Sequence, residues 1–200
     1  SGALHAEHYT VGIIGPGTGL GSVGLRKHGD LLLPIAGEAS HGGFAPESNV
    51  QIEMLSVLRE RYDRVSSERF VSGPGLENIY WALCRLHDEQ RPQLKASEIF
   101  AKATDRSDPR AAEAVQMFFE MLGQFAGDFA LALGAKDGIF ITGGIVRRYP
   151  DLLENSRFRT GFEAKGRHRS LMERIPTKLI LHEQPGLLGA SYCALELTRQ

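Results

Sequence analysis

The chain has 200 residues, 42% of them hydrophobic and 24% charged, with a formal net charge of −1. This length and composition predict a folded core in one large or two small domains, and they argue against a disordered chain. The near-zero net charge argues against a nucleic-acid partner, because no surplus of basic residues is present to neutralise phosphates. No apolar run approaches the ~20 residues that a membrane-spanning helix needs, so no membrane partner is expected.

Only two cysteines occur, Cys84 and Cys193, and each lies within an apolar helical pattern. Cysteines in that setting are typical of small buried side chains, and they do not indicate a disulfide or a metal site. Since no signal peptide is visible, we expect a reducing, cytoplasmic environment. The short basic stretches at 147–148 and 165–169 are interpreted as solvated surface.

Three β-type segments open the chain, at residues 8–14, 21–27 and 31–36. Because the connections between them are short, the three strands are expected to pair antiparallel. Later β-type runs occur from Gly138 to a glycine pair and at 178–182. Long helical stretches separate these later strands, so crossover connections are expected to place them parallel in the sheet.

Helical periodicity accounts for most of the remaining chain. A helix capped by Ser48 or Asn49 carries Ile52 on its apolar side. Pro109 suits the first position of a long helix that reaches about Gly134 and is expected to be central, since it is apolar on most faces. Further helices are expected from Pro74, at 97–103, around 151–162 and from Pro185 through Leu197.

The predicted fold class is therefore α/β: a mixed sheet of three antiparallel strands, extended by parallel strands and covered by helices. This order of elements resembles the ribonuclease-H-like half of the actin-like ATPase superfamily. No internal repeat or linker divides the chain.

Residues 15–21 read GPGTGLG, with four glycines at alternate positions and one threonine; we call them the glycine loop. Because the glycines carry no side chains, this backbone can approach a ligand closely and point several N–H groups at an anion, usually a phosphate. We therefore assign Gly17, Thr18 and Gly19 to a ligand site, together with the pair Gly143-Gly144 at a strand end. The alternative interpretation is two ordinary glycine-rich turns.

Glu38 and His41 lie in residues 37–46 (GEASHGGFAP), which we call the Glu38 loop, and Glu68 precedes another stretch rich in Gly and Pro. Carboxylates accept hydrogen bonds from neighbouring hydroxyls, as recognition of a sugar requires, and a histidine can donate or accept. The alternative for each of these residues is an ordinary surface side chain. No third ligand is placed near Glu38 and His41, so no metal site is predicted.

Taken together, these motifs resemble the bacterial ATP-dependent glucokinases of the hexokinase superfamily, from about Tyr9 to the C-terminus. The glycine loop is similar to that family's second phosphate loop, and the Glu38 loop is similar to its glucose loop. The next sugar-contacting segment, the adenosine motif and the start of the last helix are similar to residues 65–76 (VSSERFVSGPGL), 139–146 (IFITGGIV) and 185–189 (PGLLG).

The resemblance implies that Glu38, His41 and Glu68 bind glucose hydroxyls, while Thr18 and the glycines meet the phosphates of ATP. It also implies Mg²⁺ as the accompanying ion and transfer of the γ-phosphate of ATP to the 6-hydroxyl of glucose. The chain departs from the family at Ala39-Ser40, where two glycines are usual. We expect these side chains to crowd the loop and weaken sugar binding slightly.

The family's N-terminal domain carries a phosphate loop of the Asp-Gly-Gly-Thr type and an Asn-Asp pair whose Asp is the catalytic base, and neither motif occurs in this sequence. We therefore interpret residues 1–185 as the large C-terminal domain, without a catalytic residue of its own. Residues 186–200 are interpreted as a terminal helix that packs on the small N-terminal domain. Alone, the chain is expected to be inactive and to self-associate through this helix, for example as a homodimer, or to be disordered in its last turns.

Two alternatives stay open from the sequence. One is a sugar-binding regulatory module that kept the pocket without catalysis. The other is a kinase for a different hexose. Neither is separated from a glucokinase by the motifs alone.

Overall fold

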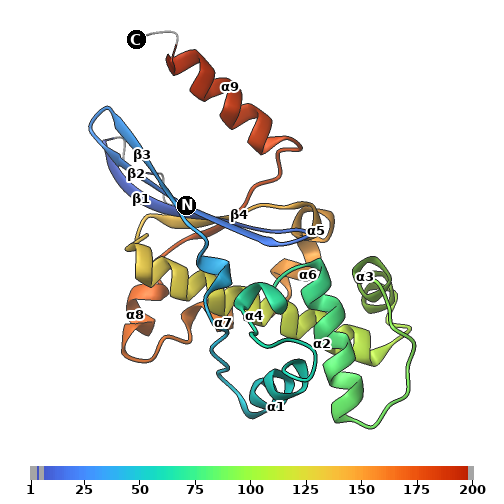
Figure 1. Cartoon of the computed structure of the whole chain (residues 1–200). Helices are drawn as coiled ribbons and strands as arrows, with labels where there is room; N and C mark the ends of the chain where they lie inside the picture. Colours follow the sequence, from blue (N-terminus) through green and yellow to red (C-terminus); the bar gives the residue numbers. More distant parts are fainter. Residues whose placement is uncertain (1–3, 5–6, 198–200) are drawn as a thin grey trace.

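A layer of helices covers one face of a single open sheet (Figure 1). The structure, a computed structural model, describes residue 4 and residues 7–197. The sheet contains β1 (His8–Pro16), β2 (Leu20–His28), β3 (Leu31–Ala36), β4 (Gly138–Ile141) and β5 (Thr177–Leu179), in the order β3-β2-β1-β4-β5. β1–β2 and β2–β3 pair antiparallel, whereas β1–β4 and β4–β5 pair parallel. The predicted α/β class and mixed sheet are confirmed.

The longer helices lie where the sequence predicts them, although several ends differ. They are α1 (Asn49–Leu58), α2 (Gly73–Leu86), α3 (Ala96–Thr104), α4 (Pro109–Leu133) and α9 (Pro185–Leu197). The shorter ones are α5 (Gly144–Arg148), α6 (Pro150–Glu154), α7 (Phe158–Glu163) and α8 (Arg169–Met172), with 3-10 turns η1 (Ala39–His41), η2 (Ser67–Arg69) and η3 (Gly166–His168).

Polar side chains set the helix ends. Ser48 caps α1 and Ser72 caps α2, each by accepting a backbone N–H three residues later. The prediction of a single helix around 151–162 is wrong, because α6 ends at Glu154 and Ser156 accepts the N–H of Phe158 at 3.1 Å. A serine that bonds the backbone locally in this way competes with helix continuation and favours a new start. β5 is also shorter than predicted, since its partner β4 ends at Ile141.

The central helix α4 supplies much of the core. Phe118, Phe119, Met121 and Leu122 are fully buried, as the apolar pattern predicts, and each such side chain contributes about 1.5–3 kcal/mol of burial free energy. The helix ends at Gly134, whose φ of 69° is left-handed, a conformation that glycine adopts without strain.

A buried polar network holds the N-terminus of α4. Asp108 accepts hydrogen bonds from the backbone N–H of Arg110 at 2.9 Å, from the Tyr80 hydroxyl at 2.9 Å and from Arg91 at 2.7 Å. Burial, together with the Asp108 hydrogen bond, raises the pKa of Tyr80 to about 12. Burial alone would raise the pKa of Asp108, but the bonds from Tyr80 and from the backbone hold that pKa below its ordinary value.

Three expectations about exposure need correction. Cys84 is buried, but Cys193 on α9 is exposed, because α9 projects away from the sheet (Figure 1) and gains no cover from it. Ile52 points to solvent, while Met54 and Leu58 bury the inner side of α1. Lys165 is also not solvated, since its side chain is only 5% exposed. Among the described residues, no helix is both long and apolar enough to cross a membrane.

Candidate functional site

The glycine loop joins β1 to β2 as a hairpin and is fixed to the start of α2. The Gly17 carbonyl accepts the N–H of Gly73 at 2.8 Å, and the Gly17 N–H donates to the Gly19 carbonyl at 2.7 Å. The N–H groups of Thr18 and Gly19 have no hydrogen-bond partner in the described part of the chain. Two adjacent backbone donors therefore remain for an anion, whereas the Gly17 N–H does not.

The second glycine segment lies against the first. Gly143 follows β4 and precedes α5. Its φ of 107° is a backbone conformation that residues other than glycine rarely adopt. A Cβ atom at Gly143 would lie 2.4 Å from the Pro16 carbonyl oxygen. The parallel pairing of β1 and β4 thus requires a glycine here, and it brings the pair Gly143-Gly144 beside the glycine loop.

A groove of about 460 Å³ opens between these segments and the helices. Gly17, Thr18 and Gly144 line it, with residues from the first turns of α2 and α3 opposite. Gly19 and Gly143 adjoin these residues but are outside the lining. The lining also includes the half-buried ring of Tyr149, which stacks on the buried ring of Phe100 with centroids 4.5 Å apart.

Several residues of the groove were missed by the sequence analysis. Glu77, Ser97, Phe100, Arg148 and Tyr149 all line it. The sequence carries no local signal for them, because α2, α3 and α5 meet only through tertiary packing. Arg148 was interpreted as part of a solvated basic stretch, but it contributes a positive charge to the groove.

Glu68, in η2, connects the glycine loop to the second group of predicted residues. Its Oε2 atom accepts the N–H of Leu20 at 2.8 Å. One carboxylate oxygen therefore holds the end of the hairpin loop, which leaves Oε1 to accept from another donor. This contact places a negative charge directly beside the glycine loop.

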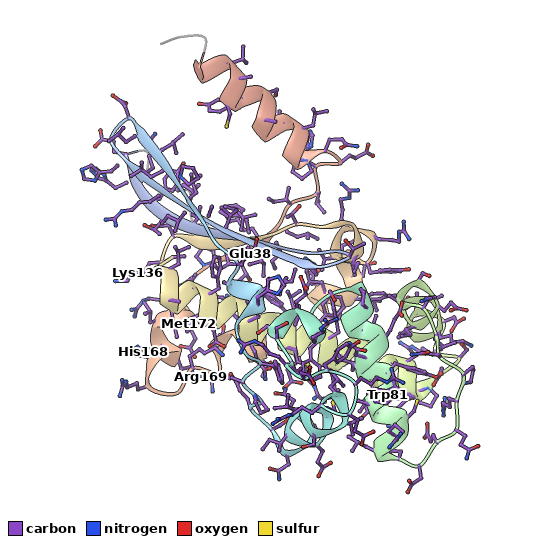
Figure 2. The ribbon with its side chains drawn as sticks, viewed as in Figure 1. Glu38, Trp81, Lys136, His168, Arg169 and Met172 are labelled. Carbon is purple, nitrogen blue, oxygen red and sulfur yellow. The ribbon has the colours of Figure 1, made fainter. Side chains whose placement is uncertain are left out.

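Glu38 and His41 are held next to η2 by backbone pairing. The Ser67 N–H donates to the Gly42 carbonyl at 3.0 Å, and the Phe44 N–H donates to the Val65 carbonyl at 3.1 Å. His41 Nε2 lies 3.8 Å from Glu38 Oε2. Figure 2 shows Glu38 where the chain leaves the sheet toward the helices. The structure thus places the Glu38 loop beside the segment that carries Glu68.

Both polar groups of the Glu38–His41 pair face solvent. The side chains are 83% exposed for Glu38 and 58% exposed for His41. Ser40, between them, is buried, and its hydroxyl has no hydrogen-bond partner among the described residues. Ala39 remains exposed, so of the two side chains expected to crowd the loop, only Ser40 occupies interior space.

A second cavity, of about 420 Å³, lies between β5 and the α6–α7 region. Its lining is mostly apolar, including Leu153, Phe158 and Leu179, and it contains none of the predicted site residues. Gly17, Thr18 and Gly144 therefore meet at the groove beside the glycine loop, whereas Glu38, His41 and Glu68 lie outside its lining. We take the groove, with Glu68 adjoining the glycine loop, as the candidate site.

Comparison with known proteins shows the family to which the chain belongs. A family model described as "Glucokinase" matches residues 2–197. The chain is 41% identical over 189 residues to a glucokinase of Xanthomonas oryzae pv. oryzae, which covers 94% of this chain and 56% of that protein. The chain thus spans about half the length of the curated relatives it matches.

Solved glucokinase structures share the fold of this chain. A glucokinase from an Antarctic psychrotroph has a TM-score of 0.89 and 30% identity, covering 96% of this chain and 60% of that one. A ROK family glucokinase from Streptomyces griseus, solved in complex with glucose and AMPPNP, has a TM-score of 0.58 and 20% identity, covering 92% and 59%. At that identity the second likeness shows the fold alone.

Proposed function

Because the chain belongs to the glucokinase family, we propose that it forms the glucose- and ATP-binding part of an ATP-dependent glucokinase. The proposed reaction transfers the γ-phosphoryl group of ATP to the 6-hydroxyl of glucose. The observation that carries this proposal is the contact of Glu68 with the glycine loop. One carboxylate there adjoins both the proposed phosphate donors and the proposed sugar loop, and phosphoryl transfer depends on holding donor and acceptor close together.

For the sugar, we propose that Glu38, His41 and Glu68 bind glucose hydroxyls. Glu68 has one oxygen engaged by Leu20 and a second oxygen left for a hydroxyl donor. Glu38 and His41 are exposed and adjacent, so a sugar can reach them without prior rearrangement of the core. Hydrogen bonds from hydroxyls to charged carboxylates are worth about 1.5–3 kcal/mol each.

For the nucleotide, we propose that Thr18 and Gly19 donate to phosphate oxygens, with Gly17, Gly143 and Gly144 shaping the adjoining backbone. The half-buried ring of Tyr149 in the groove lining offers an apolar surface for a purine ring. The Streptomyces griseus glucokinase, which shares this fold, holds an ATP analogue together with glucose. Mg²⁺ would enter with the polyphosphate and neutralise charge on the transferring group.

For catalysis, we propose that the general base lies outside this sequence, which contains no Asn-Asp pair. The chain alone is then inactive, since a positioned base supplies about 10²–10⁴ in rate. We place the protein in the cytoplasm; both cysteines are free in the structure, which suits a reducing compartment.

The test compares the 200-residue chain with a chimera. The chimera joins this chain to the part of the Xanthomonas oryzae relative that the chain does not span. We expect glucose-dependent ADP release from the chimera and none from the chain. Turnover by the purified chain, free of host kinase, would overturn the proposal that the general base lies outside this sequence.

The same chimera separates the two alternatives. A regulatory sugar-binding module predicts glucose binding without ADP release in the chimera. A kinase for another hexose predicts a higher kcat/KM for that sugar than for glucose in a panel of hexoses.

A further inference from the structure

The Lys165 side chain is covered behind the Glu38 loop, where its charge meets two partly exposed carboxylates. Its side chain is only 5% exposed, and its ammonium lies 2.7 Å from Glu47 Oε1 and 3.0 Å from Asp128 Oδ1. A buried ammonium without partners is costly, so both carboxylates are needed to keep it there. The two partners belong to different parts of the fold: Asp128 to the central helix α4, and Glu47 to the segment that follows the Glu38 loop.

The path of the Lys165 stem is fixed by close packing on α4. A Cβ atom at Gly127 would lie 2.7 Å from Lys165 Cε and 2.6 Å from the Phe162 carbonyl oxygen. The stem therefore crosses α4 in the space that the missing side chain leaves. Because α4 contributes many buried residues to the core, the ammonium is anchored to a well-packed part of the molecule.

The other end of the contact is the exit of the Glu38 loop. Glu47 directly follows the loop, and its N–H donates to the Gln51 side chain at 2.8 Å at the start of α1. Upstream, Gly42 and Phe44 pair with residues 65–67. The loop is thus held on the η2 side by backbone bonds, and on the α4 side by the Lys165–Glu47 ion pair.

We propose that Lys165 is a positioning residue that, through Glu47, holds the Glu38 loop on α4 in the geometry that binds the sugar. This inference rests on the proposed function for the meaning of that geometry. It does not make Lys165 catalytic, since the ammonium is occupied by two carboxylates.

The first experiment needs no sugar and uses the 200-residue chain. Hydrogen exchange is measured for the Phe44 and Ser67 amides, whose bonds join the Glu38 loop to η2, with the amides of α4 as an internal reference. In Lys165→Met, which keeps the stem, and in Glu47→Gln, at the half-exposed end, we expect about tenfold faster exchange at these two amides relative to α4. Lys165→Arg should stay within about threefold of the wild type.

The control is Lys136→Met, which removes an exposed lysine (Figure 2) and should leave the exchange pattern unchanged. Wild-type exchange at Phe44 and Ser67 in both Lys165→Met and Glu47→Gln would overturn the proposal. Equal acceleration of the α4 amides in both variants would overturn it as well, because the ion pair would then hold the whole domain and not the loop.

The second experiment measures kinetics in the chimera described above. Lys165→Met and Glu47→Gln should raise KM for glucose about tenfold, with kcat and KM for ATP within about twofold of the unmodified chimera. Equal losses in kcat and in KM for both substrates would contradict a role in positioning the sugar loop. If the unmodified chimera does not use glucose, the proposed function fails, while the exchange experiment still decides whether Lys165 holds the loop.

Discussion

Replacing Glu68 by alanine removes two interactions at once, and the structure gives a magnitude for each. The first is the charge-assisted bond from the Leu20 N–H to Glu68 Oε2, at 2.8 Å and partly buried. Leaving that N–H without a partner costs about 1–3 kcal/mol of unfolding free energy. The second is the proposed bond from a glucose hydroxyl to Oε1, worth about 1.5–3 kcal/mol, or roughly 10- to 150-fold in sugar affinity.

Two assays separate these effects. Urea unfolding of the 200-residue chain reports the first, as a lower midpoint with an unchanged m value. Steady-state kinetics of the chimera with glucose report the second, as a fall in kcat/KM. Glu68→Gln should keep most of the stability, because the amide oxygen still accepts from Leu20, but it should lose part of the sugar affinity.

The matched control is Glu60→Ala, which removes an exposed carboxylate paired with Arg85 at 3.3 Å on the surface. We expect Glu60→Ala to change the free energy of unfolding by no more than about 0.5 kcal/mol, since surface ion pairs contribute little to stability. If Glu68→Ala matched Glu60→Ala in both assays, Glu68 would be a surface carboxylate and the link between the two loops would carry no function.

Three further predictions concern other elements. Gly143→Ala should lower the unfolding free energy by about 1–3 kcal/mol because it combines a positive φ with a backbone clash, whereas Gly144→Ala, with open space around it, should change it little in the same urea titration. Asp108→Asn should destabilise the chain at neutral pH, because the folded-state pKa of Asp108 is lowered. The contribution of this carboxylate to the free energy of unfolding is therefore fully present above the unfolded-state pKa of about 3.9. It is lost as the pH falls through the folded-state pKa. Unfolding curves from pH 7 down to pH 2 should therefore converge for the two proteins, and a constant gap would refute the charge argument. Deletion of residues 186–200 should convert a self-associating chain into a monomer in sedimentation, because α9 exposes large apolar side chains. These are Leu187, Leu188, Tyr192 and Leu195. A monomer before and after the deletion would refute self-association through α9.

Local signals predicted the sheet and its hairpin loop well. Alternating β-type segments with short connections lead directly to antiparallel pairing, and long helical connections lead to parallel additions. Ser48 and Pro109 marked helix starts because capping and a missing N–H act within a single turn. The break at Ser156 was missed because a side chain that bonds its own backbone interrupts a pattern that otherwise reads as helical.

The site was predictable only in part. Glycine-rich loops and nearby carboxylates are visible in sequence, so residues on those loops were found. Glu77 and Arg148 were not, because the walls of the groove come from helices far apart in the chain. The same reason explains Lys165: a basic stretch is typical of surface, and only packing against Gly127 shows that this side chain is buried. Whether the predicted residues bind sugar and nucleotide stays a prediction.

The pairing of β1 with β4 bears on how the protein is made. The Thr10 N–H donates to Asp137 at 2.8 Å across 127 positions of sequence, and closing so long a loop is slow compared with forming local contacts. During translation, the glycine loop emerges before α4, and its counterpart at Gly143 emerges only after α4. Until then, one edge of β1 lacks its partner and is open to wrong pairing with other chains. A nascent chain that stalls before β4 is therefore expected to need chaperone protection.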